Sequence, residues 1–428
     1  MGAGLAGEDP RARTLGFWAL IATQFQGALS DNAFKWLVSF LVLESIVSHE
    51  QREFLFVLVV PLVFAIPFLV FSIPGGYCAD RFSKRSVTIW TKVLEVLTMG
   101  CATFALWQNR LDLAAVALFF VCTQGAIFGP SKYGLMPELL PPSKLSWGNG
   151  VIELFTLLAA IGGTLAGGLL AQAFRGRQEW SGFFLVALSL FGLITSLGIS
   201  KVPAADKKRE FSWNWTKELF EEIGRMRQDA VLWVAVIANT FFWFLGAILL
   251  LNIVLYATDV LQVDEAHSSY LLAALSLGIG AGSFIAGYAS GKRIEMGMIL
   301  PGLTGIVLAT GALFVPGLGY QAVMALLFAL GIVAGFFVVP VNALIQNRPK
   351  PEVKGRVIGA SNFLSFGGIA LQPFVQYAML RLGHPDPGHV FLICALASVA
   401  MAFVLARMLP ELWPCALYWT RLRQRASV

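Results

Sequence analysis

The sequence is poor in charged residues. Asp, Glu, Lys and Arg make up 13% of its 428 residues, and hydrophobic residues make up 57%. A water-soluble globular domain carries about a quarter charged residues, and the mean hydropathy here is +0.72. This composition excludes an ordinary soluble protein. With roughly 20 apolar residues per membrane span, the chain has room for about twelve spanning helices and for no large soluble domain.

Paired cysteines are also missing. The five cysteines have no paired spacing, so we predict no disulfide, no metal site and no cofactor. Arg11 and Arg13 precede a long apolar stretch that lacks a small-residue cleavage site, which indicates a retained first helix and not a signal peptide. The net charge of +6 is spread over loops and forms no single stripe, so we expect no nucleic-acid partner.

Apolar runs bounded by charges or turn residues predict an all-α membrane protein with twelve transmembrane helices. The predicted spans are 15–41, 54–74, 86–107, 113–137, 145–173, 181–200, 230–257, 268–290, 296–315, 320–343, 356–382 and 388–409.

Basic residues gather in alternate loops. With both termini in the cytoplasm, the outside loops hold few of them: Arg52, Arg110, Arg175, Arg177 and Arg381. The positive-inside rule therefore favours this orientation.

A polar stretch divides the chain. We expect an N-terminal six-helix bundle (1–200), a cytoplasmic linker (201–229), a C-terminal six-helix bundle (230–409) and a C-terminal amphipathic segment (410–428). The linker has apolar residues at near-helical spacing, which is typical of an interfacial helix: Trp213, Trp215, Leu219, Phe220, Ile223 and Met226. For the C-terminal segment, with Trp413, Leu417, Tyr418 and Trp419, a disordered tail is the alternative.

The two halves share an internal repeat. GYCADRFSKR (76–85) is followed by GYASGKR (287–293), and GAIFGP (125–130) by GFFVVP (335–340). Both matches have a spacing of about 210 residues, which indicates a duplicated six-helix unit. A chance echo of glycine-rich helix ends is the alternative for either match taken alone.

The first of these segments resembles the loop motif of the major facilitator superfamily. We interpret this segment as a charge latch, a set of charged residues that holds helix ends together. Gly76 permits close helix approach, Asp80 caps or pairs with a helix end, and Arg81, Lys84 and Arg85 hold the loop at the phosphate-rich membrane surface. The alternative is that any cytoplasmic loop is basic. Ser83 stands where the family commonly has glycine, and the second copy lacks the acid.

Three further segments resemble one family within this superfamily. They look like segments of the lysophospholipid transporter family (LplT): GPSKYGLMPEL (129–139) with GNGVIE (148–153), GFFVVPVNALIQ (335–346) and QFQGALSDNA (24–33). The similarity covers nearly the whole chain. Some members have a basic residue in helix 7, whereas AILLLNIVLY (247–256) has none.

This resemblance implies the function. It implies a flippase that moves lysophospholipids such as lysophosphatidylethanolamine across a bacterial inner membrane for re-acylation. The expected partners are the lysophospholipid, membrane lipids, and a cytoplasmic acyltransferase with an acyl-acyl-carrier-protein synthetase, to which some relatives are fused. None of His49, His267, His384 and His389 has an Asp five positions later. We therefore expect no acyltransferase activity and no enzyme.

Charged residues inside spans need a partner or a task, because each costs roughly 2.5–3.5 kcal/mol on insertion. Six lie away from the ends of the spans: Asp31, Lys35, Lys92, Glu95, Lys132 and Glu153. Asp31 with Lys35, and Lys92 with Glu95, have the spacing to pair on one helix face. Lys132 lies between Pro130 and Gly134 and suits a phosphate; snorkelling to water is the alternative.

Uncharged amides complete the candidate set. We expect the substrate to contact Asp31, Asn32, Lys132, Asn149, Glu153, Asn239, Asn342 and Gln346. Each amide has a structural alternative as a hydrogen bond between helices.

Two rival functions stay open. One is a proton-coupled exporter of small hydrophobic compounds, in which Asp31 or Glu153 titrates. The other is a membrane scaffold that positions an acyltransferase and transports nothing.

Overall fold

The structure is a computed structural model that describes residues 10–45, 60–210, 214–291, 294–383 and 386–418. Within these ranges, nine helices are long and apolar enough to cross a membrane. They follow the predicted runs closely: the run 145–173 is α6 (Leu145–Ala173), and the run 230–257 is α9 (Ala230–Leu255). The agreement has a physical cause, because a chain in lipid must satisfy its backbone polar groups within each segment. The predicted all-α membrane fold is confirmed.

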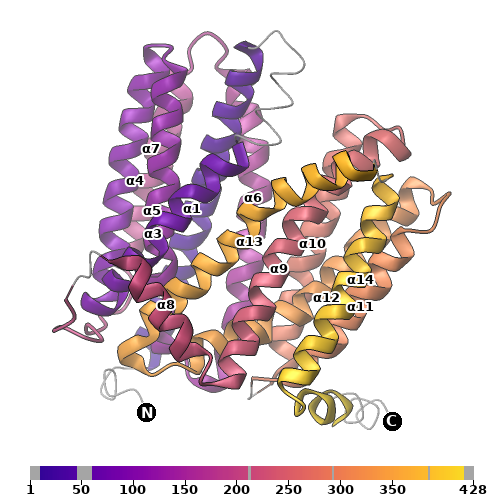
Figure 1. Cartoon of the computed structure of the whole chain (residues 1–428). Coiled ribbons are helices and arrows are strands. Elements are labelled where there is room, and N and C mark those ends of the chain that lie inside the picture. Colours follow the sequence, from indigo (N-terminus) through magenta and orange to yellow (C-terminus); the bar gives the residue numbers. More distant parts are fainter. Residues whose placement is uncertain (1–9, 46–59, 211–213, 292–293, 384–385, 419–428) are drawn as a thin grey trace. The chain divides into compact units, whose positions relative to one another are not determined.

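The described residues form two compact units, and the first comprises those within 1–141, 158–223 and 349–363. Its helices are α1 (Pro10–Ser45), α3 (Val60–Arg81), α4 (Lys84–Trp107), α5 (Leu111–Leu139), α7 (Glu179–Leu197), most of α8 (Trp215–Met226), the later part of α6 and the start of α13 (Lys354–Gly383). Helix α4 packs against α5 and α7, and α3 packs against α5 (Figure 1). Phe34, Leu37, Met99, Val121 and Leu185 form part of the buried core.

The second unit comprises the described residues within 142–157, 224–348 and 364–428. Its helices are the start of α6, α9, α10 (Glu265–Ala289), α11 (Ile299–Leu313), α12 (Tyr320–Asn347), the rest of α13, and α14 (Pro387–Met408). Helix α12 packs against α9, α10 and α11, and α14 packs against α9 and α11. These contacts make α12 the central helix of this unit.

The contact between α10 and α12 depends on glycine. Gly278 and Gly282 of α10 face Gly331 and Gly335 of α12, and a Cβ atom on Gly282 would lie 2.2 Å from the carbonyl oxygen of Ile332. Small residues four apart on both helices let the two backbones touch, which is a common packing mode in membranes.

The compact units and the predicted halves differ in two short segments. Residues 142–157, at the start of α6, belong to the second unit, and residues 349–363, at the start of α13, belong to the first. The division at the linker 201–229 therefore stays a prediction of the sequence.

The predicted linker helix is present as α8. Its Leu219 and Met226 are buried, whereas Phe220 is 71% exposed. Trp213 lies outside the described residues. In the C-terminal segment residues 412–418 are helical; Trp419 lies outside the part of the chain that the structure describes.

Candidate functional site

The charge latch is assembled around Asp80 at the end of α3. Its side chain is completely buried and accepts hydrogen bonds from the backbone N–H groups of Gly355, at 2.6 Å, and Arg356, at 3.0 Å. These N–H groups belong to the first turn of α13, where they have no partner within the helix. Asp80 thus caps α13 and complements the positive end of its dipole.

Glycines allow this approach. A Cβ atom on Gly76 would lie 2.6 Å from the carbonyl oxygen of Gly355, and one on Gly359 would lie 2.7 Å from that of Ser72. Larger residues at either position would push α3 and α13 apart and remove the cap.

Asp80 also pairs with two arginines, Arg356 at 3.8 Å and Arg209 at 2.9 Å, and Arg209 was not among the residues predicted from the sequence. Nη1 of Arg209 donates to Asp80 Oδ2 at 2.9 Å and to the carbonyl oxygen of Gly76 at 3.3 Å, and its Nη2 pairs with Glu218 of α8. Burial lowers the pKa of Arg209, and the Asp80 carboxylate opposes this effect. Arg209 therefore ties the linker and α8 to the latch. Spacing gave no signal for it, because it lies 129 residues from Asp80.

Two of the three basic residues of the motif, Lys84 and Arg85, contact protein groups. Lys84 is fully buried and forms an ion pair with Glu138 at 2.5 Å. Arg85 donates to the carbonyl oxygens of Leu197 and Ile199 at the end of α7. The expectation that Lys84 holds the loop at the membrane surface is wrong, because its ammonium is used inside the protein. Arg81 is half-buried.

A polar position lies within the first unit where α1 meets α5. The half-buried Asp31 accepts hydrogen bonds from Nε2 of Gln124, at 3.2 and 3.4 Å to its two oxygens. The Oε1 atom of Gln124 is buried with no hydrogen-bond partner among the described residues. An unpaired buried acceptor beside a carboxylate suits a ligand that donates hydrogen bonds. Gln124 was missed in the sequence because it is uncharged.

Asn32 and Lys35 follow Asp31 on the same helix. Asn32 donates to the carbonyl oxygen of Ala28 at 2.8 Å and accepts from Nζ of Lys35 at 3.1 Å. Asn32 therefore orients the ammonium group of Lys35, which lies one helical turn from Asp31 on α1.

Lys132 lies among aromatic rings on α5. Its Nζ is 4.4 Å from the ring centre of Tyr133 and 5.9 Å from that of Phe128, and its side chain is half-buried. Aromatic faces stabilise an ammonium group by cation–π attraction.

The expected pairing of Lys92 with Glu95 is confirmed. Nζ of Lys92 lies 2.6 Å from Glu95 Oε2, and both side chains are buried. Gln26 donates to Glu95 at 2.8 Å and accepts from Lys92 at 3.1 Å, and Ser189 also donates to Glu95. This cluster joins α1, α4 and α7 and supports a structural role for both charges.

Three of the predicted polar residues of the second unit make specific side-chain contacts. Asn149 and Gln346 exchange two hydrogen bonds, at 2.7 and 3.0 Å, between α6 and α12. Asn239 donates to Ser365 at 3.0 Å, and its Oδ1 is buried with no partner among the described residues. The pair Asn149 and Gln346 fits the alternative of hydrogen bonding between helices.

Glu153 and Asn342 belong to the same unit. Glu153 is 6% exposed in α6, and Asn342 is half-buried in α12. Glu153 precedes the linker in sequence but packs with the second unit.

Comparison with known proteins finds relatives that match most of the chain. The lysophospholipid transporter LplT of Escherichia coli (strain K12 / DH10B) is 27% identical over 385 residues, covering 86% of this chain and 90% of that protein. LplT of Klebsiella pneumoniae subsp. pneumoniae is 27% identical over 367 residues, covering 83% and 86%.

Two solved structures have the same fold. The transporter FucP in the outward conformation has a TM-score of 0.73 and 15% identity, covering 93% of this chain and 99% of FucP. The human organic anion transporter MFSD10 has a TM-score of 0.74 and 13% identity, covering 93% and 100%. The family model of the Major Facilitator Superfamily matches residues 18–373. The chain therefore belongs to the Major Facilitator Superfamily.

Proposed function

We propose that the chain is a lysophospholipid flippase that works by alternating access. The observation that carries this proposal is the similarity to the two LplT proteins over more than four fifths of both chains. The membership of the superfamily supports a carrier that moves its substrate without changing it chemically.

The polar groups of the first unit support a headgroup site. Asp31 and the unpaired Oε1 of Gln124 offer acceptors that suit an ammonium group. Lys132 offers an ammonium that suits a phosphate as a point charge. An aminophospholipid headgroup has both of these charges, so Asp31, Asn32, Gln124 and Lys132 form the proposed headgroup set.

The latch around Asp80 supports a moving contact. Hydrogen bonds join the end of α3 to the start of α13, and an ion pair joins α3 to the linker. Alternating access would break and remake these contacts. Gly76, Asp80, Arg81, Lys84 and Arg85 stay the proposed gating set, and Arg209 joins them.

The proposed location is a bacterial inner membrane, and the distribution of basic residues supports an orientation with both termini in the cytoplasm. A lysophospholipid delivered to that side requires an acyl donor and an acyltransferase. A cytoplasmic acyltransferase with an acyl-acyl-carrier-protein synthetase is therefore the proposed partner.

A sidedness assay tests the function. Purified protein is reconstituted in liposomes with labelled lysophosphatidylethanolamine in one leaflet, with and without a proton gradient. We expect the label to cross in protein-containing vesicles only. No crossing under either condition would favour the scaffold, and transport of small hydrophobic cations that requires the pH gradient would favour the exporter.

A further inference from the structure

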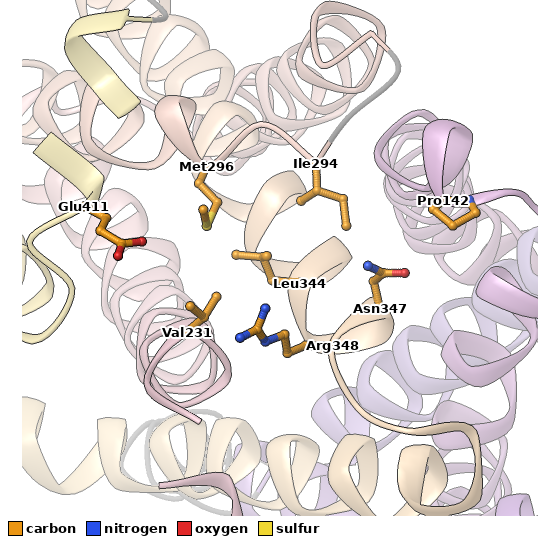
Figure 2. A pocket seen from close by; sticks show the side chains of 8 residues that line it. All are labelled: Pro142, Val231, Ile294, Met296, Leu344, Asn347, Arg348 and Glu411. Atoms are coloured by element: carbon orange, nitrogen blue, oxygen red, sulfur yellow. The ribbon is translucent and has the colours of Figure 1, made fainter. Parts of the chain in front are cut away.

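A cavity in the second unit is separate from the residues described above. Its volume is about 460 Å³, within the range of about 300–1,000 Å³ that is usual for small-molecule sites. Figure 2 shows the side chains that line it; those that matter here are Val231, Ile294, Met296, Leu344, Arg348 and Glu411.

The cavity lies where several helix ends meet. Val231 is in the first turn of α9, Leu344 and Arg348 are at the end of α12, and Ile294 and Met296 connect α10 to α11. Glu411 follows the end of α14. By the distribution of basic residues, these ends lie at the expected cytoplasmic surface. A ligand there would sit between lipid and water.

Arg348 is held in place at the cavity wall. Its Nε donates to Asp229 Oδ2 at 2.7 Å, and the side chain is half exposed. Asp229 also caps α9 by accepting from the N–H groups of Val231 and Leu232. In Figure 2 the terminal amino groups of Arg348 point into the cavity. A positioned guanidinium with donors directed at an apolar space suits a phosphate.

Asp229 is suited to hold this arginine. Burial alone would raise its pKa, but the hydrogen bond from Arg348 and those from the backbone of α9 outweigh that effect, so the pKa of Asp229 is lowered. The carboxylate is thus ionised at neutral pH and keeps the guanidinium oriented.

Glu411 lies on the wall of the cavity opposite Asn347 in Figure 2. Its side chain is exposed. The cavity therefore offers a cation, an anion and an apolar wall between them. That combination matches a zwitterionic head joined to a hydrocarbon chain, whereas an uncharged hydrophobic compound would leave both charges unused.

We propose that this cavity is a second headgroup site, for a single-chain phospholipid that carries both a phosphate and an ammonium group. Arg348 binds the phosphate, Glu411 binds the ammonium, and Val231, Met296 and Leu344 contact the first methylene groups. The inference rests on the proposed function, in which this site receives the lysophospholipid on its cytoplasmic side.

Photo-crosslinking of the full-length protein in detergent tests the site. The probes are lysophosphatidylethanolamine and lysophosphatidylglycerol, each with a diazirine in the acyl chain next to the glycerol, and adducts are mapped by mass spectrometry. We expect adducts of the first probe on residues 294–298 and 344–348. Arg348→Gln should lower their yield at least fivefold for both probes, and Arg348→Lys should restore most of it. Glu411→Gln should lower the yield for the ethanolamine lipid only.

Matched variants control for loss of charge alone. Arg407→Gln and Glu352→Gln remove one exposed charge each outside the cavity wall and should leave the adducts unchanged. An excess of inorganic phosphate that removes the adducts of both probes would show that the cavity takes phosphate without the lipid, and would overturn the proposal. An equal loss for both probes in Glu411→Gln would overturn the ammonium assignment.

The sidedness assay on the same preparations separates the two proposals. Normal transport without adducts at these segments overturns the second site and leaves the proposed function intact. If the adducts depend on Arg348 but the protein transports no lysolipid, the second site is supported and the proposed flippase function is overturned.

Discussion

At the scale of single residues, burial and pairing distinguish charges that hold helices together from those proposed to contact the substrate. Lys92 and Glu95 lie in one intramembrane cluster with Gln26 and Ser189, in which each charge has a partner. Asp31 and Lys132 are half-buried, and the acceptor next to Asp31 is unpaired within the described residues. Lys92 and Glu95 therefore hold helices together, whereas Asp31 and Lys132 are the residues to test for substrate contact.

Lys132→Ala should weaken transport and leave folding nearly unchanged. The lost contact is a charged hydrogen bond to phosphate, which is worth about 1.5–3 kcal/mol, or roughly a tenfold to hundredfold loss of affinity. Transport in the sidedness assay and thermal stability in detergent are measured together. Lys144→Ala, which removes an exposed lysine near the start of α6, is the control. Normal transport by Lys132→Ala would remove the phosphate role.

Asp80→Asn should slow turnover more than it weakens substrate binding. The change leaves Arg209 buried with a neutral partner, and breaking a buried pair costs about 3–5 kcal/mol. Arg209→Gln should have a similar effect, and the double variant should be little worse than either single one, because both changes remove the same ion pair between Asp80 and Arg209.

Turnover and lysolipid affinity are measured separately for these variants, with Lys208→Gln, an exposed neighbour in the linker, as the control. Weakened binding with unchanged turnover would count against the latch, and additive effects of the two changes would show that Asp80 and Arg209 act apart.

At the scale of elements, close packing of backbones sets which helices stay together. The glycines of α10 and α12 allow contacts that any side chain would block. The start of α13 is held differently, by the cap from Asp80 and by the linker through Arg209. The contact between α10 and α12 is held mainly by backbone packing, with a hydrogen bond from the Tyr320 hydroxyl to the carbonyl oxygen of His267 near one end, whereas the start of α13 is held by several polar contacts. We therefore expect α10 and α12 to move as one body and the latch to open and close.

Gly282→Ala should destabilise the protein. The added Cβ would lie 2.2 Å from the carbonyl oxygen of Ile332, and forcing extra atoms into a packed contact costs about 1–3 kcal/mol. Gly311→Ala in α11 is the matched control, because a Cβ atom there meets nothing within 4 Å. Thermal unfolding in detergent measures both. Equal melting temperatures for the two variants would contradict the packing argument.

At the scale of the whole molecule, charge is divided unequally along the chain. The six charges that lie away from the ends of the predicted spans all precede the linker, whereas Arg356, Arg381 and Arg407 lie within two residues of a span end. An amphipathic substrate explains such a division better than a uniformly polar one. Glu153 nevertheless packs with the second unit. Among the aromatic residues of the C-terminal half, Phe337 is fully buried in the core, whereas Phe241, Phe242, Trp243 and Phe244 are half-buried.

A lysolipid with a photoreactive group at the end of its acyl chain should label the C-terminal half. We expect adducts mainly in α9 and α12, because each buried methylene gains about 0.8 kcal/mol against an apolar wall and the charged helices leave little such surface. The alternative is that the charges only tie the N-terminal helices together. Labels found mainly in α1 to α6 would support that alternative.

The sequence by itself determined the spans, the repeat and the superfamily. Hydrophobicity fixes a helix in lipid because each segment must satisfy its own backbone hydrogen bonds, so α6 and α9 begin where the apolar runs begin. Local spacing was also enough for Lys92 and Glu95, which lie on one helix face.

The tertiary structure alone decided which distant residues meet. Arg209 reaches Asp80 across 129 residues, Gln124 contacts Asp31 across 93, and Gln346 pairs with Asn149 across 197. The cavity beside Arg348 likewise combines helix ends from separate parts of the chain. Sequence periodicity reports only what lies on one helix, whereas a site between helices depends on how their faces pack.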